Sequence, residues 1–363
     1  TLFFATEEPS LGVELWISRG SAESTFPVTD LCPGTCSGGP KALGVAGGRF
    51  YFAARYGNFW SDLAVYSMLP SGADLQRVIV QSDDLRLEFL FAAYPQGYFA
   101  EVAGRAVFVA LRSDGSKVLL SSSGRESDTA QFFHFADVLD SRFPYGFTQV
   151  DASRAIFFFA LGFDDEVDEL WVTDGSTAGT RALRPLGTYA QPSSPQNAGS
   201  AVYFLSRTPT GSDLWTTDGT ESGSAPLTNF ADPTSRITGF DVGESRTYFA
   251  VLSATAGQEL WSTDGTVAST HAATSIGYHE PFGSDYNVLG NLEFLAVVGS
   301  RAYFIANDGI HSPQLWRTDG DPASSTVVAE ICSEGECGGA WVEAVGDRVL
   351  FSGASSLGIE PMI

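Results

Sequence analysis

The chain is built from short segments rich in aromatic and β-branched residues, and glycine or serine separates successive segments. Typical examples are residues 50–52, 156–158 and 202–204. Residues of these types favour short antiparallel strands. No segment of helical length repeats its apolar residues with a period of 3.6. The pattern predicts an all-β protein.

A second pattern repeats along the chain: a Leu-Trp pair, then Asp-Gly, then Ser or Thr. Clear copies occupy residues 169–176, 213–220, 259–266 and 314–321. A fifth, at 14–21, has Arg in place of Asp, and weaker ones occupy 62–66, 118–124 and 358–363. The tryptophan position of the copies falls at 16, 64, 120, 171, 215, 261, 316 and 362, so the intervals run from 44 to 56 residues. This interval matches one four-stranded blade of a β-propeller.

The repeated motif has a mechanical explanation. Leu and Trp are neighbours on a strand and point to opposite faces, so both faces must be buried, as in a blade packed between two others. Asp-Gly is expected to make a tight hairpin turn, with glycine at positive φ and aspartate bonding nearby amides. We therefore interpret Asp174, Asp218, Asp264 and Asp319 as turn residues rather than as a ring of metal ligands.

These repeated residues resemble the ELWxxDGT-repeat family of secreted bacterial β-propeller-like proteins. The resemblance covers nearly the whole chain and is strongest from about residue 153 to 331. It implies a propeller and implies no particular activity. We expect residues 1–363 to form a single β-propeller domain of four-stranded antiparallel blades.

Eight copies favour an eight-bladed propeller, and seven blades with a trailing hairpin is the alternative. The expected repeat units are about 1–46, 47–103, 104–152, 153–198, 199–243, 244–298, 299–344 and a partial unit 345–363. The first copy lacks the strand that would precede Phe3, and the last lacks the strand after Met362. One segment upstream of Thr1 would supply both and close the ring, so we expect the natural chain to begin before Thr1.

The four cysteines form two local pairs, Cys32 with Cys36 and Cys332 with Cys337. Their spacing differs from the Cys-x2-Cys pairs of zinc sites and no histidine is near, so two disulfide-closed turns are predicted. Disulfides persist in oxidising compartments, which predicts a secreted protein, periplasmic or extracellular. No apolar run of about 18 residues occurs, so no membrane span is expected.

The charge is strongly acidic, with 43 Asp and Glu against 20 Lys and Arg and a net charge of −23. Phosphate would be repelled, which excludes nucleic acid as a partner. No cofactor is expected, with Ca²⁺ as the alternative. The best local calcium candidate is Asp164, Asp165, Glu166 and Asp168, in what is expected to be a loop between two strands. It lacks the residue order of a known calcium loop, so a solvated loop is favoured.

Binding and catalytic residues are harder to identify. Segment 277–292 carries Tyr278, His279, Phe282 and Tyr286 among glycines, a composition common in binding loops, and we predict that it contacts a partner. A self-packed cover is the alternative. No catalytic residues are predicted, because no Gly-x-Ser-x-Gly elbow occurs and the histidines follow no ligand pattern. Paired carboxylates of a glycosidase cannot be picked out among 43 acidic residues.

These observations favour a binding role over catalysis. We expect a secreted or surface propeller that binds protein or glycan through its inter-blade loops, as a scaffold or a subunit of a larger extracellular assembly. The alternative is a hydrolase or lyase with its site at the mouth of the central channel, and a purely structural repeat is the third candidate. An enzyme would bring polar residues of several blades together, with the pKa of a carboxyl or histidine shifted.

Overall fold

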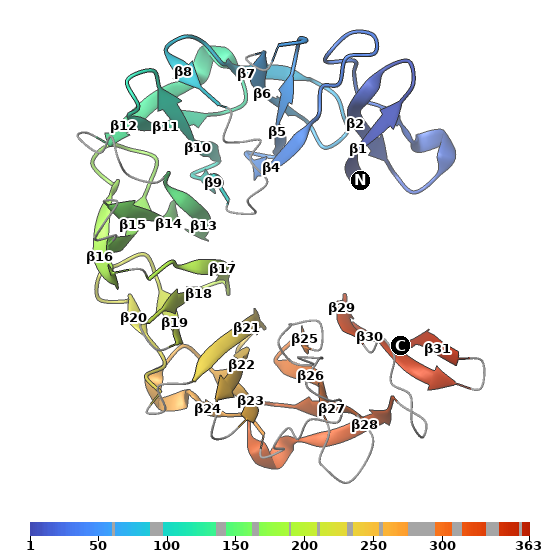
Figure 1. Ribbon diagram of the computed structural model, residues 1–363, viewed down its shortest axis with the longest axis vertical. Coiled ribbons are helices and arrows are strands. Elements are labelled where there is room, and N and C mark those ends of the chain that lie inside the picture. The colour runs from blue at the N-terminus through green and yellow to red at the C-terminus, as the bar shows by residue number, and fades with distance from the viewer. Residues whose placement is uncertain are drawn as a thin grey trace. The chain divides into compact units, whose positions relative to one another are not determined.

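The computed structural model shows an almost purely β-structured chain (Figure 1). It describes residues 1–59, 62–87, 97–135, 143–161, 167–188, 190–208, 211–230, 235–253, 257–274, 295–306, 314–331, 341–355 and 358–363. These residues form strands and short 3-10 turns, with no α-helix among them. None of the described segments is a helix long and apolar enough to cross a membrane. The expected all-β class is confirmed.

The chain divides into two compact units, residues 1–189 with 219–221 and residues 190–218 with 222–363. The described strands of the first unit form four antiparallel sheets, numbered here in chain order. Sheet 1 holds β1 (Leu2–Glu8), β2 (Gly12–Ser18) and β3 (Phe26–Pro27); sheet 2 holds β4 (Lys41–Ala46), β5 (Arg49–Arg55), β6 (Leu63–Met68) and β7 (Gln76–Val80); sheet 3 holds β8 (Leu85–Arg86), β9 (Phe99–Val102), β10 (Arg105–Arg112), β11 (Lys117–Ser122) and β12 (Ala130–Phe135); sheet 4 holds β13 (Tyr145–Asp151), β14 (Arg154–Leu161), β15 (Val167–Thr173) and β16 (Arg181–Thr188).

The described strands of the second unit form four further antiparallel sheets. Sheet 5 holds β17 (Ser193–Asn197), β18 (Val202–Arg207), β19 (Ser212–Thr217) and β20 (Ala225–Pro226); sheet 6 holds β21 (Arg236–Val242), β22 (Thr247–Ser253), β23 (Gly257–Thr263) and β24 (His271–Ala272); sheet 7 holds β25 (Leu295–Val298), β26 (Arg301–Ala306), β27 (Gln314–Thr318) and β28 (Thr326–Glu330); sheet 8 holds β29 (Val342–Val345), β30 (Arg348–Ser355) and β31 (Gly358–Met362).

The four-stranded sheets are meanders, in which each strand pairs antiparallel with the next strand of the chain. The aromatic strand predicted before each Leu-Trp pair is the direct partner of the strand that carries that pair. An aromatic side chain therefore lies opposite the tryptophan in five sheets: Phe4 opposite Trp16, Phe157 opposite Trp171, Phe204 opposite Trp215, Phe249 opposite Trp261 and Phe304 opposite Trp316. Such pairs stabilise a sheet by about 0.2–1 kcal/mol each.

The core lies between successive sheets rather than within a single layer. Leu260 belongs to the core between sheets 6 and 7, whereas Trp261 packs against the core between sheets 5 and 6. Leu315 and Trp316 divide in the same way between the cores on either side of sheet 7. The predicted burial of Leu and Trp on opposite faces is confirmed. The leucines are almost fully buried and the tryptophans partly buried.

Within each unit the sheets stack face to face, and their first strands lie next to one another (Figure 1). β4 contacts β9 and β9 contacts β13, while β17, β21, β25 and β29 follow one another in the second unit. Four-stranded antiparallel meanders packed in this way are the blades of a β-propeller, so the expected fold class is confirmed. The count of eight blades, the single domain and the closed ring stay predictions.

The sheets and the expected repeat units differ by one strand. The expected units begin at the aromatic strand, for example at residue 47 or 104, whereas sheet 2 begins with β4 at Lys41 and the main first strand of sheet 3 is β9, from Phe99. Each expected unit therefore contains the last three strands of one sheet and the first strand of the next. This first strand is the one that positions the candidate site.

Candidate functional site

The Asp-Gly turns are structural, as predicted, although they are longer than tight hairpins. Asp174 Oδ1 accepts the backbone N–H of Ser176 at 2.9 Å, and Asp264 Oδ1 accepts that of Thr266 at 3.1 Å. Gly175 has φ of +82°. The chain then continues through a loop of several residues before the fourth strand, with a 3-10 turn in the copy that contains Asp264. Asp174 and Asp264 therefore act on their own backbone, whereas Asp319 accepts a hydrogen bond of 2.7 Å from Arg301.

The Cys32–Cys36 disulfide is present, with the two Cα atoms 5.2 Å apart. The loop that it closes covers Glu14, whose side chain is fully buried. The carboxylate of Glu14 accepts backbone N–H groups of Leu31 at 3.2 Å, Cys32 at 3.4 Å and Gly38 at 3.0 Å. Burial raises the pKa of Glu14, and the three amides offset part of that rise. Cys332 and Cys337 lie outside the described residues.

The acidic segment expected to be a loop is partly strand. Asp168 lies within β15, is buried, and pairs in register with Gly187. It is therefore not the exposed loop ligand that the sequence suggested, because the strand begins earlier than the acidic pattern implies. Asp164, Asp165 and Glu166 lie outside the described residues. In the part of the chain that is described, no group of three or more His, Cys, Asp and Glu side chains is placed to hold a metal ion.

The predicted binding segment is not placed. Tyr278, His279, Phe282 and Tyr286 all lie in residues 275–294, outside the described part of the chain. Their assignment as partner contacts stays a prediction.

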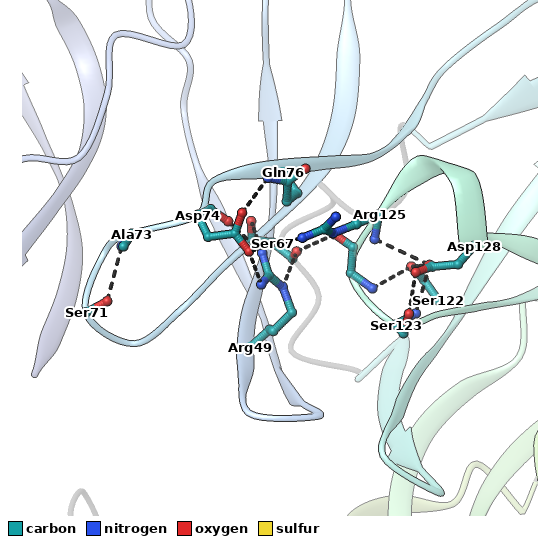
Figure 2. Close-up of polar contacts among 11 residues, drawn as sticks. Arg49, Ser67, Ser71, Ala73, Asp74, Gln76, Ser122, Ser123, Arg125 and Asp128 are labelled. Atoms are coloured by element: carbon teal, nitrogen blue, oxygen red, sulfur yellow. Dashed lines mark hydrogen bonds and ion pairs between the residues drawn. The ribbon is translucent and has the colours of Figure 1, made fainter.

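A polar network joins sheets 2 and 3 of the first unit (Figure 2). Arg49 donates to Ser67 Oγ at 2.9 Å and to the carboxylate of Asp74 at 2.7 Å. Ser67 Oγ in turn donates to the carbonyl oxygen of Gly124, in the turn that follows β11 of sheet 3. Hydrogen bonds from Arg49 and Gln76 hold the pKa of Asp74 below its usual value. The network therefore fixes one sheet to the next.

A cavity of about 540 Å³ lies beside this network. It is lined by Tyr66, Gln76, Arg77, Arg125, Glu126 and Ser127. Arg77 forms an ion pair of 3.1 Å with Glu126, and Arg125 lies 3.7 Å from Asp74. Both guanidinium groups of this cavity therefore have carboxylate partners.

A second cavity, of about 510 Å³, lies within the second unit and is built differently. Its walls are the first strands of sheets 6, 7 and 8, and it is lined by Asp241, Leu295, Ala296, Trp341, Val342, Glu343 and Ala344. We call it the carboxylate cavity. In register, Asp241 lies opposite Tyr248, Ala296 opposite Tyr303 and Glu343 opposite Leu350.

These pairings show that Asp241, Ala296 and Glu343 occupy the same position of three adjacent first strands. Each lies one residue after the apolar residue that faces the middle aromatic side chain of its sheet, as Phe240 faces Phe249. A small alanine thus stands between two carboxylate residues. Ala296 itself is buried in the core between sheets 7 and 8.

The surroundings of the two carboxyl groups differ. Asp241 is half-buried, and its Oδ1 and Oδ2 accept the backbone N–H groups of Val242 at 3.0 Å and Val297 at 3.3 Å. Burial raises the pKa of Asp241, and the two amides lower it by less. Glu343 is exposed to solvent. A half-buried carboxyl group with a raised pKa and a second carboxyl group open to water are a pair suited to acid–base chemistry.

No protein family model matches the chain, and no curated protein matches it.

Several solved structures are similar to it, all at low identity. They include a puromycin hydrolase, with a TM-score of 0.46 and 14% identity over 96% of this chain and 56% of that one. An oligogalacturonate lyase in complex with manganese has a TM-score of 0.43 and 10% identity over 97% and 93%. The β-propeller domain of the Trilobed protease from Pyrococcus furiosus has 0.40 and 10% over 89% and 94%. The chain spans about half the length of the puromycin hydrolases and the prolyl endopeptidase that it matches.

The expectation of a binding or scaffold propeller was wrong by this comparison. The similar proteins are hydrolases and lyases, which corresponds to the alternative prediction. A likeness with a TM-score below 0.5 carries no argument about chemistry, so the chemistry of this chain has to be argued from its own residues.

The sequence did carry a signal for the carboxylate cavity. Residues 240–246, 295–301 and 342–348 each lead through a turn to an arginine that opens the aromatic strand. Aligning them on that arginine brings Asp241, Ala296 and Glu343 into register, each five residues before it. This column lies two strands away from the Leu-Trp motif and is not part of it.

Proposed function

We propose that this chain is a hydrolase or lyase in which Asp241 and Glu343 are the acid and the base. The observation that carries the proposal is that both residues are among those that line one cavity, Asp241 half-buried and Glu343 exposed. Two carboxyl groups in unlike surroundings are the usual means of acid–base cleavage at near-neutral pH.

In hydrolysis, the Asp241 carboxylic acid gives its proton to the leaving oxygen as the bond from that oxygen to carbon breaks. The Glu343 carboxylate takes a proton from a water molecule, and the water oxygen forms the new bond to that carbon. The exposure of Glu343 supports this role, because the group is in contact with solvent.

In elimination, Glu343 takes a proton from a carbon next to a carbonyl or carboxyl group. The electron pair of that bond forms the carbon–carbon double bond as the bond to the leaving oxygen breaks, and Asp241 protonates the leaving oxygen. Both reactions use the same two groups in the same roles, so one pair of variants tests the proposal.

We also propose that the protein is secreted, as a member of the ELWxxDGT-repeat family. The Cys32–Cys36 disulfide supports an oxidising compartment. The net charge of −23 is compatible with a substrate other than nucleic acid. Fractionation of the native cells, with an antibody raised against the chain, tests the location.

The activity is tested with a panel of labelled neutral oligosaccharides, oligouronates and peptides. New reducing ends, the ultraviolet absorbance of an unsaturated product and free amines separate the reaction types. We expect turnover by the wild type, and a loss of kcat of about 100- to 10,000-fold in both Asp241→Asn and Glu343→Gln. If the two groups act as one unit, the double variant should lose little more than the worse single variant.

Asp347→Asn is the matched control, since this exposed carboxyl lies in the turn between β29 and β30 and is not among the residues that line the cavity. It should keep the wild-type rate. Asp241→Asn also changes a contact to sheet 7, so its thermal unfolding must be checked. Glu343→Gln changes an exposed group and should fold normally. Wild-type rates in Glu343→Gln, or no turnover of any substrate by the wild type, would overturn the proposal.

A further inference from the structure

The loop between sheets 1 and 2 holds a reactive group that the proposed activity does not use, the Cys32–Cys36 disulfide. The loop runs from β3 to β4, and all of its residues are described. The bridge joins residues only four positions apart, and a bridge of this kind removes little entropy from the unfolded chain. The fold therefore opposes reduction of this disulfide only weakly.

We propose that the Cys32–Cys36 disulfide is a thiol-exchange site, which an external dithiol reduces without unfolding the protein, and that reduction releases the Cys32 end of the loop from Glu14. The site lies in the first unit and shares no residue with the carboxylate cavity, so this inference does not depend on the proposed function.

The second half of the loop is held to β2 by contacts that do not involve the bridge. The N–H of Gly39 donates to the carbonyl oxygen of Val13 at 3.0 Å, and the N–H of Val13 donates to Ser37 Oγ at 3.1 Å. A Cβ added at Gly12 would clash with the carbonyl oxygen of Cys36, so the backbone of this half lies directly on the strand. We expect it to keep its place after reduction.

The first half of the loop is held through Glu14. The N–H groups of Leu31 and Cys32 donate to the Glu14 carboxylate at 3.2 and 3.4 Å, and that of Gly38, on the other side of the bridge, donates at 3.0 Å. Amides from both sides of the disulfide thus meet on one buried carboxylate. The side chain of Leu31 packs on the core between sheets 1 and 2, but only partly buried. Breaking the bridge therefore lets Cys32 move away while Gly38 stays.

The two sulfurs differ in access, which sets the order of the exchange. Cys32 is 1% exposed, whereas Cys36 is partly exposed and the residues between them are exposed. A thiolate of the dithiol therefore attacks the Cys36 sulfur and forms a mixed disulfide, and the bond from Cys36 to Cys32 breaks. Cys32 leaves as a thiolate beside the Glu14 carboxylate, is repelled by it, and takes a proton from solvent as the loop opens.

The second step completes the reduction. The other thiolate of the reagent attacks the reagent's own sulfur in the mixed disulfide, which closes a cyclic disulfide and releases Cys36 as a thiolate that solvent protonates. The dithiol loses two electrons and two protons, and the protein gains them.

Reduction and trapping test the exchange. Wild-type protein is treated with dithiothreitol at neutral pH without denaturant, alkylated, and mapped by peptide mass spectrometry, which distinguishes this pair from Cys332 and Cys337. We expect complete reduction of the pair while the circular dichroism of the strands is unchanged. With glutathione and iodoacetamide present together, the trapped product should carry glutathione on Cys36 and the alkyl group on Cys32.

Hydrogen exchange at single-residue resolution tests the release of the loop. Reduction should raise the exchange rate of the Cys32 amide roughly tenfold or more and leave that of Gly39 unchanged, because Gly39 is bound to β2 rather than to Glu14. In Glu14→Ala the Cys32 amide should exchange fast in both states. Glu7→Ala, which changes an exposed carboxylate of the same sheet, is the matched control and should behave as the wild type.

Each outcome decides the proposal. A pair that dithiothreitol reduces only in denaturant, or a protein that unfolds on reduction, would overturn it. Equal exchange of the Cys32 amide in the two states would also overturn it, since the loop would then keep its place over Glu14 without the bridge. Glutathione trapped on Cys32 instead of Cys36 would overturn the assigned order of attack.

Discussion

The indole N–H of Trp171 donates a hydrogen bond of 2.9 Å to the carboxylate of Glu169, two residues earlier on the same strand. Trp261 and Glu259 repeat this relationship at 3.1 Å. Residues two apart on a strand share a face, so Glu and Trp interact on one side while the leucine between them, such as Leu170, packs on the other. In these two copies the Glu-Leu-Trp triplet thus makes a polar contact on one face and an apolar contact on the other. In the first copy Glu14 binds backbone amides instead, and Trp16 Nε1 has no partner.

Sheet 7 lacks this hydrogen bond between the indole and a carboxylate. A comparison with sheet 7 therefore measures how much the bond contributes to stability. Gln314 replaces the glutamate there, and both Gln314 Oε1 and Trp316 Nε1 are buried without a hydrogen-bond partner. We expect Trp261→Phe to lower the free energy of unfolding by about 1–2 kcal/mol more than Trp316→Phe, because only the first change breaks a bond to a charged group. Urea denaturation of the two variants measures the difference.

Glu259→Ala serves as the control for that comparison. Combined with Trp261→Phe, it should cost less than the sum of the single changes, because both remove the same bond. Equal losses in Trp261→Phe and Trp316→Phe would show that the indole N–H contributes nothing.

Two turn glycines should respond differently to the same substitution. Gly175 and Gly124 both have positive φ, +82° and +116°. An added Cβ at Gly175 would meet only a methyl group of Val102 at 3.7 Å, whereas at Gly124 it would lie 2.5 Å from Arg49 Nε. Gly175→Ala should therefore cost only the conformational strain, about 1 kcal/mol, and Gly124→Ala should cost more.

Thermal unfolding of both alanine variants tests this expectation. Restoring space by combining Gly124→Ala with Arg49→Ala should not rescue the protein fully, because Arg49 also binds Ser67 and Asp74. If Gly124→Ala were no worse than Gly175→Ala, the close approach of sheets 2 and 3 at this glycine would not matter for stability.

The blades were predictable because each repeats the same local chemistry, as at Phe249 and Trp261, where an aromatic strand pairs with the Leu-Trp strand. Strand propensity, burial on both faces and turn chemistry all agree there. The site was not predictable from the same pattern. Asp241 and Glu343 are 102 residues apart in the numbering and follow no motif, and only the packing of first strands brings them to one cavity.

Asp168 illustrates the opposite error. The acidic residues before it suggested a solvated loop, yet it lies buried in β15. The strand pairing with Gly187 in β16 outweighs the polarity of the local sequence. Local composition is a weak guide wherever tertiary pairing extends a strand beyond its apolar part.

The Cys32–Cys36 disulfide and Glu14 should make coupled contributions to the free energy of unfolding. Replacing both Cys32 and Cys36 by serine removes a short cross-link worth about 2 kcal/mol in the chain-entropy model. In the wild type the double substitution should lower the free energy of unfolding by more than this. The reason is that residues 31–38, which contain the disulfide, also supply the amides that bind the buried Glu14 carboxylate. In a Glu14→Ala background the same double substitution should therefore cost less.

Urea denaturation of the four proteins in this cycle gives the coupling energy. An equal cost of the cysteine substitutions in both backgrounds would mean that the loop keeps its position over Glu14 without the disulfide. The cycle uses substitutions rather than a reducing agent, so that Cys332 and Cys337 stay unchanged.

Asp151 should make the free energy of unfolding depend on pH in the acidic range. Partial burial raises its pKa, but hydrogen bonds from Arg154, at 2.6 Å, and from Ser153 outweigh that effect and set the pKa at about 2. An unfolded aspartate titrates near pH 3.9, so the folded state binds the proton more weakly than the unfolded state. The stabilisation by ionised Asp151 is complete above about pH 5 and is lost as the pH falls towards 2. Because the side chain is 40% exposed, screening should limit it to less than about 1 kcal/mol. The free energy of unfolding of the wild type and of Asp151→Asn should therefore converge as the pH falls through this window, and parallel curves would show that the Asp151–Arg154 pair does not contribute.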